Sequence, residues 1–348
     1  MLILLNINKS DQWDELLNSL PADERDPMMS AAWYRHFGEQ GYGEAMCAAA
    51  VEGEKIALYP FLRNSINALG YSLEQKYYDI QGAPGYNGIA TNSDDPVFLA
   101  MFREEFAAWC RENSIVAEFS RCNPVTRNHT RFADEDISEV NRNIIVNLQG
   151  DFSGDYDRSV RKNIRKAERE GLTVSVVAGD QATGTVLDDF TAIYLDTMDR
   201  NAASEEYRMG LSFFTGIVNR MKDQVRVYFT KLDQLPVAAE MVVSGKATAY
   251  SWMGGTLSDY YPLRPNDILK DYIIQDLAES GRQWYCLGGG LTPGDGIFRY
   301  KRTFAMHGER SFHIMKKVHL PGIYEDILNQ WSSRNPGKTS GRLLRYRY

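Results

Sequence analysis

The order of secondary structure that the sequence predicts occurs twice along the chain. Each half carries two alternating strands around a turn, then an amphipathic helix, then one more strand. In the first half these segments are residues 45–64, 94–113 and 115–122, and in the second half they are residues 225–255, 266–281 and 283–290. The repeat is one of element order, not of residues, and it predicts a duplicated α+β unit with mixed sheets flanked by helices.

The two predicted helices carry local boundary signals. Asp95 is placed to cap the first helix and Pro96 stands in its first turn, while Gly281 follows the last apolar residue of the second helix. These signals fix where each helix begins or ends within a few residues.

Bulk composition limits the class of protein. The chain has 348 residues, of which 43% are hydrophobic and 24% charged, so it is long enough for two folded domains. A formal net charge of −7 excludes a global basic field that would draw the chain to nucleic acid or an anionic membrane. The four cysteines are widely scattered, no apolar run approaches a membrane span, and the N-terminus is typical of a first strand. We therefore expect a cytoplasmic protein.

Turn residues and composition predict the domain limits. We expect an N-terminal domain over residues 1–150, joined by a strand that returns near 305–325, and a second domain over residues 151–304. Residues 326–348 are basic and polar with a Pro-Gly break, and we expect a loosely ordered tail there.

A strongly basic helix is predicted over residues 158–170, with Gly171 at its end. A narrow apolar seam and many cations are typical of a solvated surface helix. However, Arg161, Lys162 and Arg165 lie in its first turns, where cations oppose the helix dipole. A bound anion would offset that cost, so these residues are candidates for phosphate binding.

A second unusual stretch, residues 286–304, runs from a strand into three glycines and then an aromatic and cationic segment. Gly288, Gly289 and Gly290 permit a close approach of ligand to backbone, and Lys301 would project into a ligand channel. The alternative is a glycine-rich surface loop.

These two stretches resemble the FemAB family of peptidyl- and N-acyltransferases. The quoted residues are RSVRKNIRKAEREGLTV at 158–174 and LGGGLTPGDGIFRYKRTF at 287–304, with Tyr300, Lys301 and Phe304 meeting an aromatic-Lys-x-x-Phe element. The resemblance covers roughly residues 30–320. It implies two tandem GNAT-like domains, the acyl-CoA N-acyltransferase fold.

The resemblance also implies a reaction. Family members transfer an aminoacyl or acyl group from aminoacyl-tRNA or acyl-CoA to an amine of a cell-wall or surface-polysaccharide precursor. An oxyanion forms on the attacked carbonyl, and Lys301 is the first candidate to stabilise it. Arg161, Lys162 and Arg165 would hold donor phosphates. No tightly bound cofactor is implied.

Three further residues are weaker candidates. Glu240 lies in the apolar strand VAAEMVV and would serve as a general base, although the alternation of that strand favours a solvated face. Tyr250 and Tyr300 would line the substrate channel; for Tyr250 the alternative is a place in the core.

The donor is left open by two departures from the pattern. No charged heptad run forms the coiled-coil arm that is common in the tRNA-dependent branch. Residues 260–269, where GNAT enzymes carry a glycine-rich pyrophosphate loop, contain no glycine. A GNAT-like protein that binds a glycan or nucleic acid without turnover is the alternative function.

Other kinds of site are not expected. The five histidines show no metal-ligand spacing, so we expect no metal. Residues 335–340, NPGKTS, lack the first glycine of a phosphate loop. Neither the acceptor nor the oligomeric state can be read from the sequence.

Overall fold

The computed structural model describes all 348 residues and divides into two compact units. Unit 1 comprises Met1–Val140 and Phe312–Tyr348, and unit 2 comprises Asn141–Ser311. The chain passes from one unit to the other within two strands, β7 (Ile137–Asn147) and β13 (Glu309–Val318). The division falls at residue 140 rather than near 150, and the second unit ends at 311 rather than 304.

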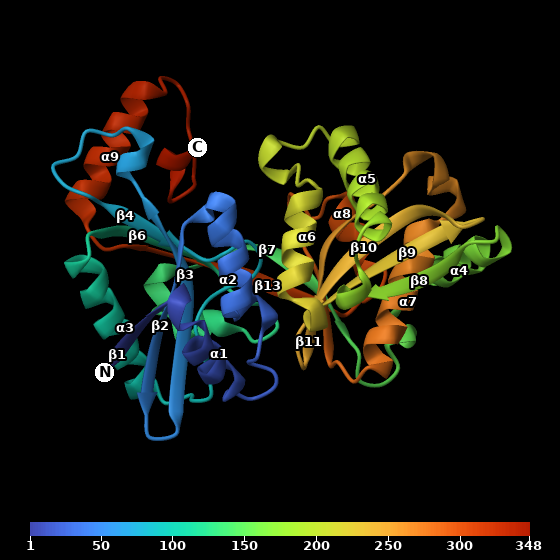
Figure 1. Ribbon diagram of the computed structural model, residues 1–348, viewed down its shortest axis with the longest axis horizontal. Coiled ribbons are helices and arrows are strands. Elements are labelled where there is room, and N and C mark those ends of the chain that lie inside the picture. Colours follow the sequence, from blue (N-terminus) through green and yellow to red (C-terminus); the bar gives the residue numbers. More distant parts are fainter. The chain divides into compact units, whose positions relative to one another are not determined.

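Unit 1 is a mixed sheet with helices (Figure 1). Its strands pair in the order β1-β2-β3-β4-β6-β13, with β5 on β3. The strands are β1 (Leu2–Asn6), β2 (Glu44–Glu52), β3 (Lys55–Ser65), β4 (Tyr78–Gln81), β5 (Ala90–Thr91), β6 (Ile115–Arg121) and the second part of β13. The helices are α1 (Ser10–Asn18), α2 (Ala31–Phe37), α3 (Pro96–Glu112) and α9 (Pro321–Arg334).

Unit 2 repeats this plan. Its strands pair in the order β8-β9-β10-β11-β12-β7. The strands are β8 (Thr173–Ala178), β9 (Val225–Leu232), β10 (Leu235–Ser244), β11 (Thr248–Thr256) and β12 (Trp284–Gly288), with most of β7. The helices are α4 (Arg158–Arg169), α5 (Thr185–Arg200), α6 (Leu211–Arg220), α7 (Pro265–Glu279) and α8 (Gly296–Arg302).

The two units correspond element by element. Apart from the short β5 between β4 and α3, unit 1 runs β1-α1-α2-β2-β3-β4-α3-β6, and unit 2 runs β8-α5-α6-β9-β10-β11-α7-β12. In each unit one pair of strands is parallel, β4 with β6 and β11 with β12, and the strand after it is antiparallel. The α+β fold class and the duplicated architecture are thus confirmed.

Local signals explain the element boundaries. The Asp95 carboxylate accepts the backbone N–H of Val97 at 2.9 Å and so caps α3, as its sequence predicts. Asp157 caps α4 in the same way, accepting the Ser159 N–H at 2.8 Å. The turn between β9 and β10 has positive φ at both central residues, as two-residue hairpins of this twist require.

The expectation of a loosely ordered tail is wrong. Residues 321–334 form α9, and Trp331 and Tyr346 are buried in an apolar cluster of unit 1. Tyr346 donates its hydroxyl to the buried Asp79 carboxylate at 2.9 Å, and the Arg347 Nε donates to the same carboxylate at 2.8 Å. One arginine of this basic tail thus neutralises a buried acid, a role that composition alone does not reveal.

None of the helices is both long enough and apolar enough to span a bilayer.

Candidate active site

Two parallel strands of unit 2 separate at their C-terminal ends. β11 and β12 pair only over Thr248–Tyr250 and Trp284–Cys286. Beyond this point β12 continues beside β7, and from Ser251 onward the edge of β11 that faced β12 has no strand partner. Backbone N–H and C=O groups therefore become available to a ligand in the middle of the domain.

A buried polar network lies beside this separation. Lys270 on α7 forms an ion pair with Glu240 on β10, and its Nζ also donates to Ser251 Oγ and to the Tyr285 hydroxyl, each at 3.2 Å. Tyr285 donates its own hydroxyl to the other oxygen of Glu240. Burial lowers the pKa of Lys270 and raises the pKa of Tyr285. The network fixes α7 to three strands of the sheet.

The solvated face predicted for Glu240 is wrong. The residue is only 8% exposed, because α5 packs on one face of β10 and α7 packs on the other (Figure 1). In a strand covered on both faces, alternation does not separate inside from outside. Both carboxylate oxygens already accept hydrogen bonds, so Glu240 is not an unengaged base.

Lys301 is half-buried on α8. Its Nζ donates to the Gly289 carbonyl oxygen at 2.8 Å. Burial, and then the nearby charge of Lys270, lower the pKa of Lys301 from 10.5 to about 8. At neutral pH the side chain is still mostly protonated and able to donate to a developing oxyanion, but it lies close to the pH at which it loses its charge.

The glycine stretch is required by packing within the protein. Only Gly288 has a positive φ, of 75°. A Cβ on Gly289 would lie 2.7 Å from the Arg142 carbonyl oxygen, and one on Gly290 would lie 2.1 Å from the Asp295 carboxylate. That carboxylate caps α8 through the Phe298 N–H. At two of the three glycines, therefore, the close neighbour is the chain itself and not a ligand.

A cavity of about 310 Å³ opens between α4, the start of α7 and α8. Its lining residues are Ser159, Asn163, Tyr261, Arg264, Pro265, Asn266, Asp267, Tyr300 and Thr303. Asp267 is 6% exposed, accepts a hydrogen bond from Asn163 Nδ2 at 3.0 Å, and has its pKa raised by burial. Tyr300, a predicted site residue, lines the cavity and donates its hydroxyl to the Asn266 carbonyl at 2.9 Å. The cavity thus combines the N-terminus of a helix, one arginine and one buried acid.

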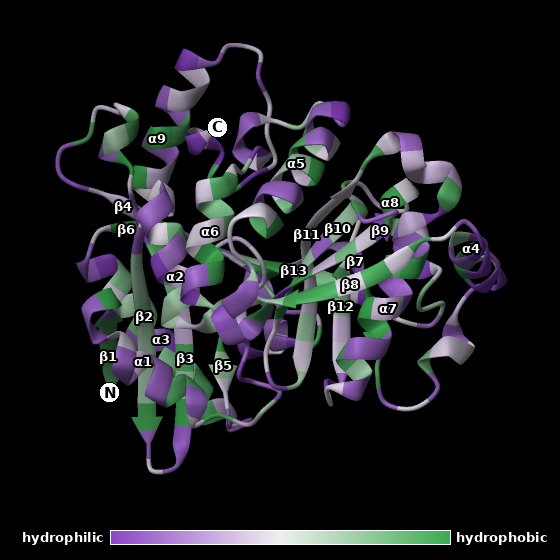
Figure 2. Cartoon of the chain, turned by 45° about the vertical axis from the view of Figure 1, so that its right-hand side comes forward, coloured by the Kyte–Doolittle hydropathy of each residue, from purple (hydrophilic) through white to green (hydrophobic).

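The other predicted residues lie elsewhere. Figure 2 shows α4 as a strongly hydrophilic helix, and Arg161, Lys162 and Arg165 are exposed on it without lining the cavity. The Arg161 guanidinium donates to the Ser153 carbonyl at 2.6 Å. Tyr250 is buried, with 1% exposure, which favours the place in the core. The phosphate-binding role of the three cations stays a prediction.

Sequence reasoning missed Asn163, Arg264, Asp267 and Lys270. A signal for Lys270 was present, because it lies within the apolar stripe Leu269, Ile273, Ile274 and Leu277 of α7. Asp267 stands in the first turn of the same helix, where an acid is ordinary and attracts no attention.

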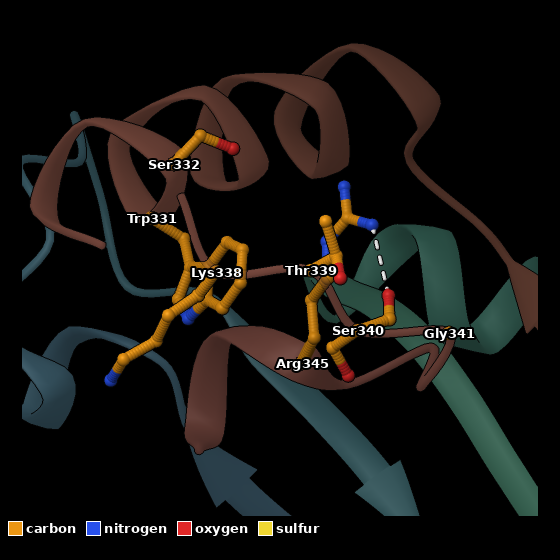
Figure 3. Close-up of a pocket in the computed structure, with 7 residues that line it drawn as sticks. All are labelled: Trp331, Ser332, Lys338, Thr339, Ser340, Gly341 and Arg345. Atoms are coloured by element: carbon orange, nitrogen blue, oxygen red, sulfur yellow. Dashed lines mark hydrogen bonds between the residues drawn. The ribbon is translucent and has the colours of Figure 1, made fainter. Parts of the chain in front are cut away.

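A larger cavity, of about 400 Å³, lies in the C-terminal part of unit 1 (Figure 3). It is lined by Trp331, Ser332, Lys338, Thr339, Ser340, Gly341 and Arg345, and it contains no acid. Arg345 donates to the Ser340 carbonyl at 3.2 Å, so part of its charge is already engaged. We regard the unit 2 cavity as the candidate active site because a buried carboxyl and a helix N-terminus meet there.

Comparison with known proteins also favours the unit 2 cavity over the unit 1 cavity. Residues 154–302 match the acetyltransferase (GNAT) domain family, and this range contains the whole unit 2 cavity except for Thr303. Residues 154–302 are thus a GNAT-type transferase domain, and the whole chain has a FemX-like fold. This confirms the recognition made from the two sequence motifs. No curated protein matches the sequence.

Solved structures share the fold of this chain at low identity. FemX superposes with a TM-score of 0.67 at 11% identity, covering 93% of this chain and 99% of that one. L-PGS from Bacillus licheniformis gives a TM-score of 0.57 at 14% identity, covering 94% and 97%. The C-terminal domain of a putative lysylphosphatidylglycerol synthetase from Agrobacterium fabrum gives 0.55 at 14% identity, covering 94% and 95%. At these identities the likeness establishes the fold alone.

Proposed function

We propose that this GNAT protein transfers an acyl or aminoacyl group from a phosphate-bearing donor to an amine of a cell-wall or surface-polysaccharide precursor. The donor is an acyl-CoA or an aminoacyl-tRNA. The observation that carries the proposal is the cavity at the start of α7, where Arg264, the N-terminal end of the helix and the buried Asp267 meet inside the GNAT-matching range. The FemAB resemblance supports the choice of acceptor.

Donor phosphates would bind at the start of α7. The first turn of a helix presents unpaired N–H groups and a partial positive charge. Arg264, at the N-cap, adopts the left-handed conformation, with a φ of 67°. This conformation is usually adopted by a glycine. Here Arg264 adopts it, so the loop turns into the helix without a glycine. The missing glycine at 260–269 therefore does not argue against a pyrophosphate here.

Residues around the cavity would assist the reaction in distinct ways. The acceptor amine attacks the carbonyl carbon of the ester or thioester, and negative charge develops on the carbonyl oxygen. Asp267 would take the proton from the attacking amine, since burial raises its pKa toward the range of a working base. Lys301 would donate to the oxyanion, and as the carbonyl re-forms the bond to the departing sulfur or oxygen breaks and that atom takes the proton that Asp267 had removed from the amine.

We place the reaction in the cytoplasm. Aminoacyl-tRNA and acyl-CoA are cytoplasmic donors, and all four cysteines are buried as free thiols.

The first experiment is thermal unfolding with separate ligands. Acetyl-CoA, charged tRNA and a nucleotide-linked amino sugar are each added to the wild type, to Arg264→Ala and to Arg161→Ala. A ligand at about 100 times its dissociation constant stabilises by about 2.7 kcal/mol, which a melt resolves. We expect one donor to stabilise the wild type but not Arg264→Ala, and weaker stabilisation of Arg161→Ala would mean that the exposed cations of α4 also contact the donor phosphates.

The donor identified in this way is then tested for turnover. If tRNA binds, its affinity should fall steeply with salt, whereas that of acyl-CoA should fall much less. Donor binding without transfer to any amine would favour the alternative function, a protein that binds a ligand without turnover. No stabilisation by either donor, or equal stabilisation of Arg264→Ala, would contradict the proposed site.

A further inference from the structure

Unit 1 contains a buried polar cluster that the proposed transfer reaction does not use. Its members are Cys110 near the end of α3, Glu118 in the middle of β6, and His319 directly after β13. All three residues lie outside the range that matches the GNAT domain family. Cys110 and Glu118 are eight residues apart and His319 lies 201 residues beyond Glu118, so the three form no short ligand-spacing motif.

The three side chains converge on one point. One potential ligand atom from each, the Cys110 Sγ, a Glu118 carboxylate oxygen and a His319 ring nitrogen, lie within 4.8 Å of one another. The His319 Nε2 is 2.8 Å from the Glu118 Oε2. Exposure is 0% for Cys110, 3% for Glu118 and 6% for His319, so bulk water does not reach the cluster.

The surroundings of this cluster are short of hydrogen-bond partners. The Tyr59 hydroxyl faces the Glu118 carboxylate without forming a hydrogen bond of ordinary geometry. The Ser120 Oγ is buried beside the same Tyr59 hydroxyl, also without a hydrogen bond of ordinary geometry. The His319 Nδ1 is buried and has no hydrogen-bond partner. Unsatisfied buried polar atoms are costly and rare, so several in one place point to a missing group.

The equivalent network of unit 2 provides an internal comparison. Both draw on corresponding elements, α3 and β6 in unit 1 and α7 and β12 in unit 2, but unit 2 adds Glu240 of β10 where unit 1 adds His319. In unit 2 the Lys270 ammonium, the Glu240 carboxylate and the Tyr285 hydroxyl form hydrogen bonds with one another. The unit 1 cluster has no permanent cation among its members, although it holds a carboxylate and a thiol.

We propose that Cys110, Glu118 and His319 bind one divalent transition-metal ion, with zinc as the expected ion. Thiolate sulfur, imidazole nitrogen and carboxylate oxygen are the zinc ligands of proteins. When the ion binds, the Cys110 thiol gives up its proton, and the two charges of the ion are balanced by one thiolate and one carboxylate. That neutrality suits a site from which water is excluded. Tyr59 and Ser120 supply further oxygens beside the three ligands.

The function of such an ion would be structural. His319 follows the strand that the end of the chain adds to unit 1, while Cys110 and Glu118 belong to the preceding helix and strand. An ion shared by the three would hold β13 to β6 and α3, and its binding energy would contribute to folding. We expected no metal site because the histidines lack metal-ligand spacing along the sequence. Ligands that come from three different segments do not show such spacing.

The test is a metal count on tag-free, full-length protein. The protein is expressed with zinc in the medium and dialysed against metal-free buffer, and its metal content is measured by mass spectrometry. We expect one zinc ion per chain in the wild type. The matched control is Cys122→Ser, since Cys122 is also a buried free thiol of unit 1 but lies outside the cluster. It should retain the ion, whereas Cys110→Ser and His319→Gln should lose it.

A second measurement does not depend on the variants folding. Wild-type chain refolded with cobalt should show the absorption of thiolate-to-cobalt charge transfer, and the Cys110 thiol should resist alkylation. The proposal is overturned if wild type contains no metal after both expression and refolding with zinc. A cobalt complex without the thiolate band, or full metal content in Cys110→Ser, overturns it equally; the cluster would then be a Glu118–His319 hydrogen bond completed by a buried water.

Discussion

Replacing Lys301 with methionine should stabilise the folded protein. The protein holds this ammonium group where burial and Lys270 lower its pKa from 10.5 to about 8. Each factor of ten in proton affinity is about 1.4 kcal/mol, so keeping the charge at pH 7 costs about 3 kcal/mol. Methionine has a similar length and no charge, but it gives up the hydrogen bond to the Gly289 carbonyl, which is worth about 1 kcal/mol. We expect a net gain of about 2 kcal/mol at pH 7.

The pH dependence of this gain has a definite sign. Between the folded pKa of about 8 and the unfolded value of 10.5, Lys301 is neutral in the folded state and still charged in the unfolded state. The unfolded state then binds more protons, so the contribution of Lys301 to stability rises with pH across this window. Below pH 8 the cost is constant. The advantage of Lys301→Met should therefore shrink as the pH rises through the window.

Urea unfolding at pH 7 and near pH 10 measures both effects. Tyrosines also titrate at alkaline pH, but they do so in both proteins and cancel in the difference. Lys162→Met, at an exposed position on α4, serves as the control and should change stability little. The reasoning is refuted if Lys301→Met is less stable than wild type at pH 7, or if its advantage is the same at both pH values. Loss of transfer activity in the same stabilised variant would mark Lys301 as a residue kept for function.

Three further predictions concern the fold that supports the site. Glu240→Gln and Lys270→Met should each cost about 3–5 kcal/mol in urea unfolding, because each leaves a buried partner unpaired, and the double variant should cost much less than their sum. Arg347→Ala should destabilise the folded protein by about 3 kcal/mol, since it removes the cation beside the buried Asp79. An unchanged unfolding midpoint would instead support the original expectation of a loosely ordered tail. Gly290→Ala should lower the thermal midpoint and transfer activity together, because its Cβ would lie 2.1 Å from the carboxylate that caps α8; a normal melt would contradict that crowding.

Features with local causes could be predicted from the sequence. Asp95 and Pro96 mark the start of α3 because a cap and a fixed φ act within one turn. Gly281, with a φ of 80°, follows α7 for a similar reason. The repeated order of elements was readable as well, since periodicity is a property of short windows.

Features that depend on distant partners could not be predicted. The hydrogen bond between Asn163 and Asp267 joins residues 104 positions apart, and neither is unusual in its own segment. The burial of Glu240 follows from two helices that cover both faces of its strand, which periodicity within the strand does not encode. The order of the tail rests on an acid in β4, more than 250 residues earlier in the sequence.

The way in which unit 1 is assembled has a consequence for synthesis on the ribosome. Unit 2 is one continuous segment, whereas unit 1 takes most of β13 and all of α9 from residues that are translated after unit 2. Until residue 318 has emerged, the edge of β6 that β13 will cover has no partner within unit 1. An open strand edge is a template for pairing with other chains. A nascent chain would thus complete its second unit first and carry an unfinished first unit, so ribosome stalling between residues 140 and 318 should leave that unit the more prone to aggregation.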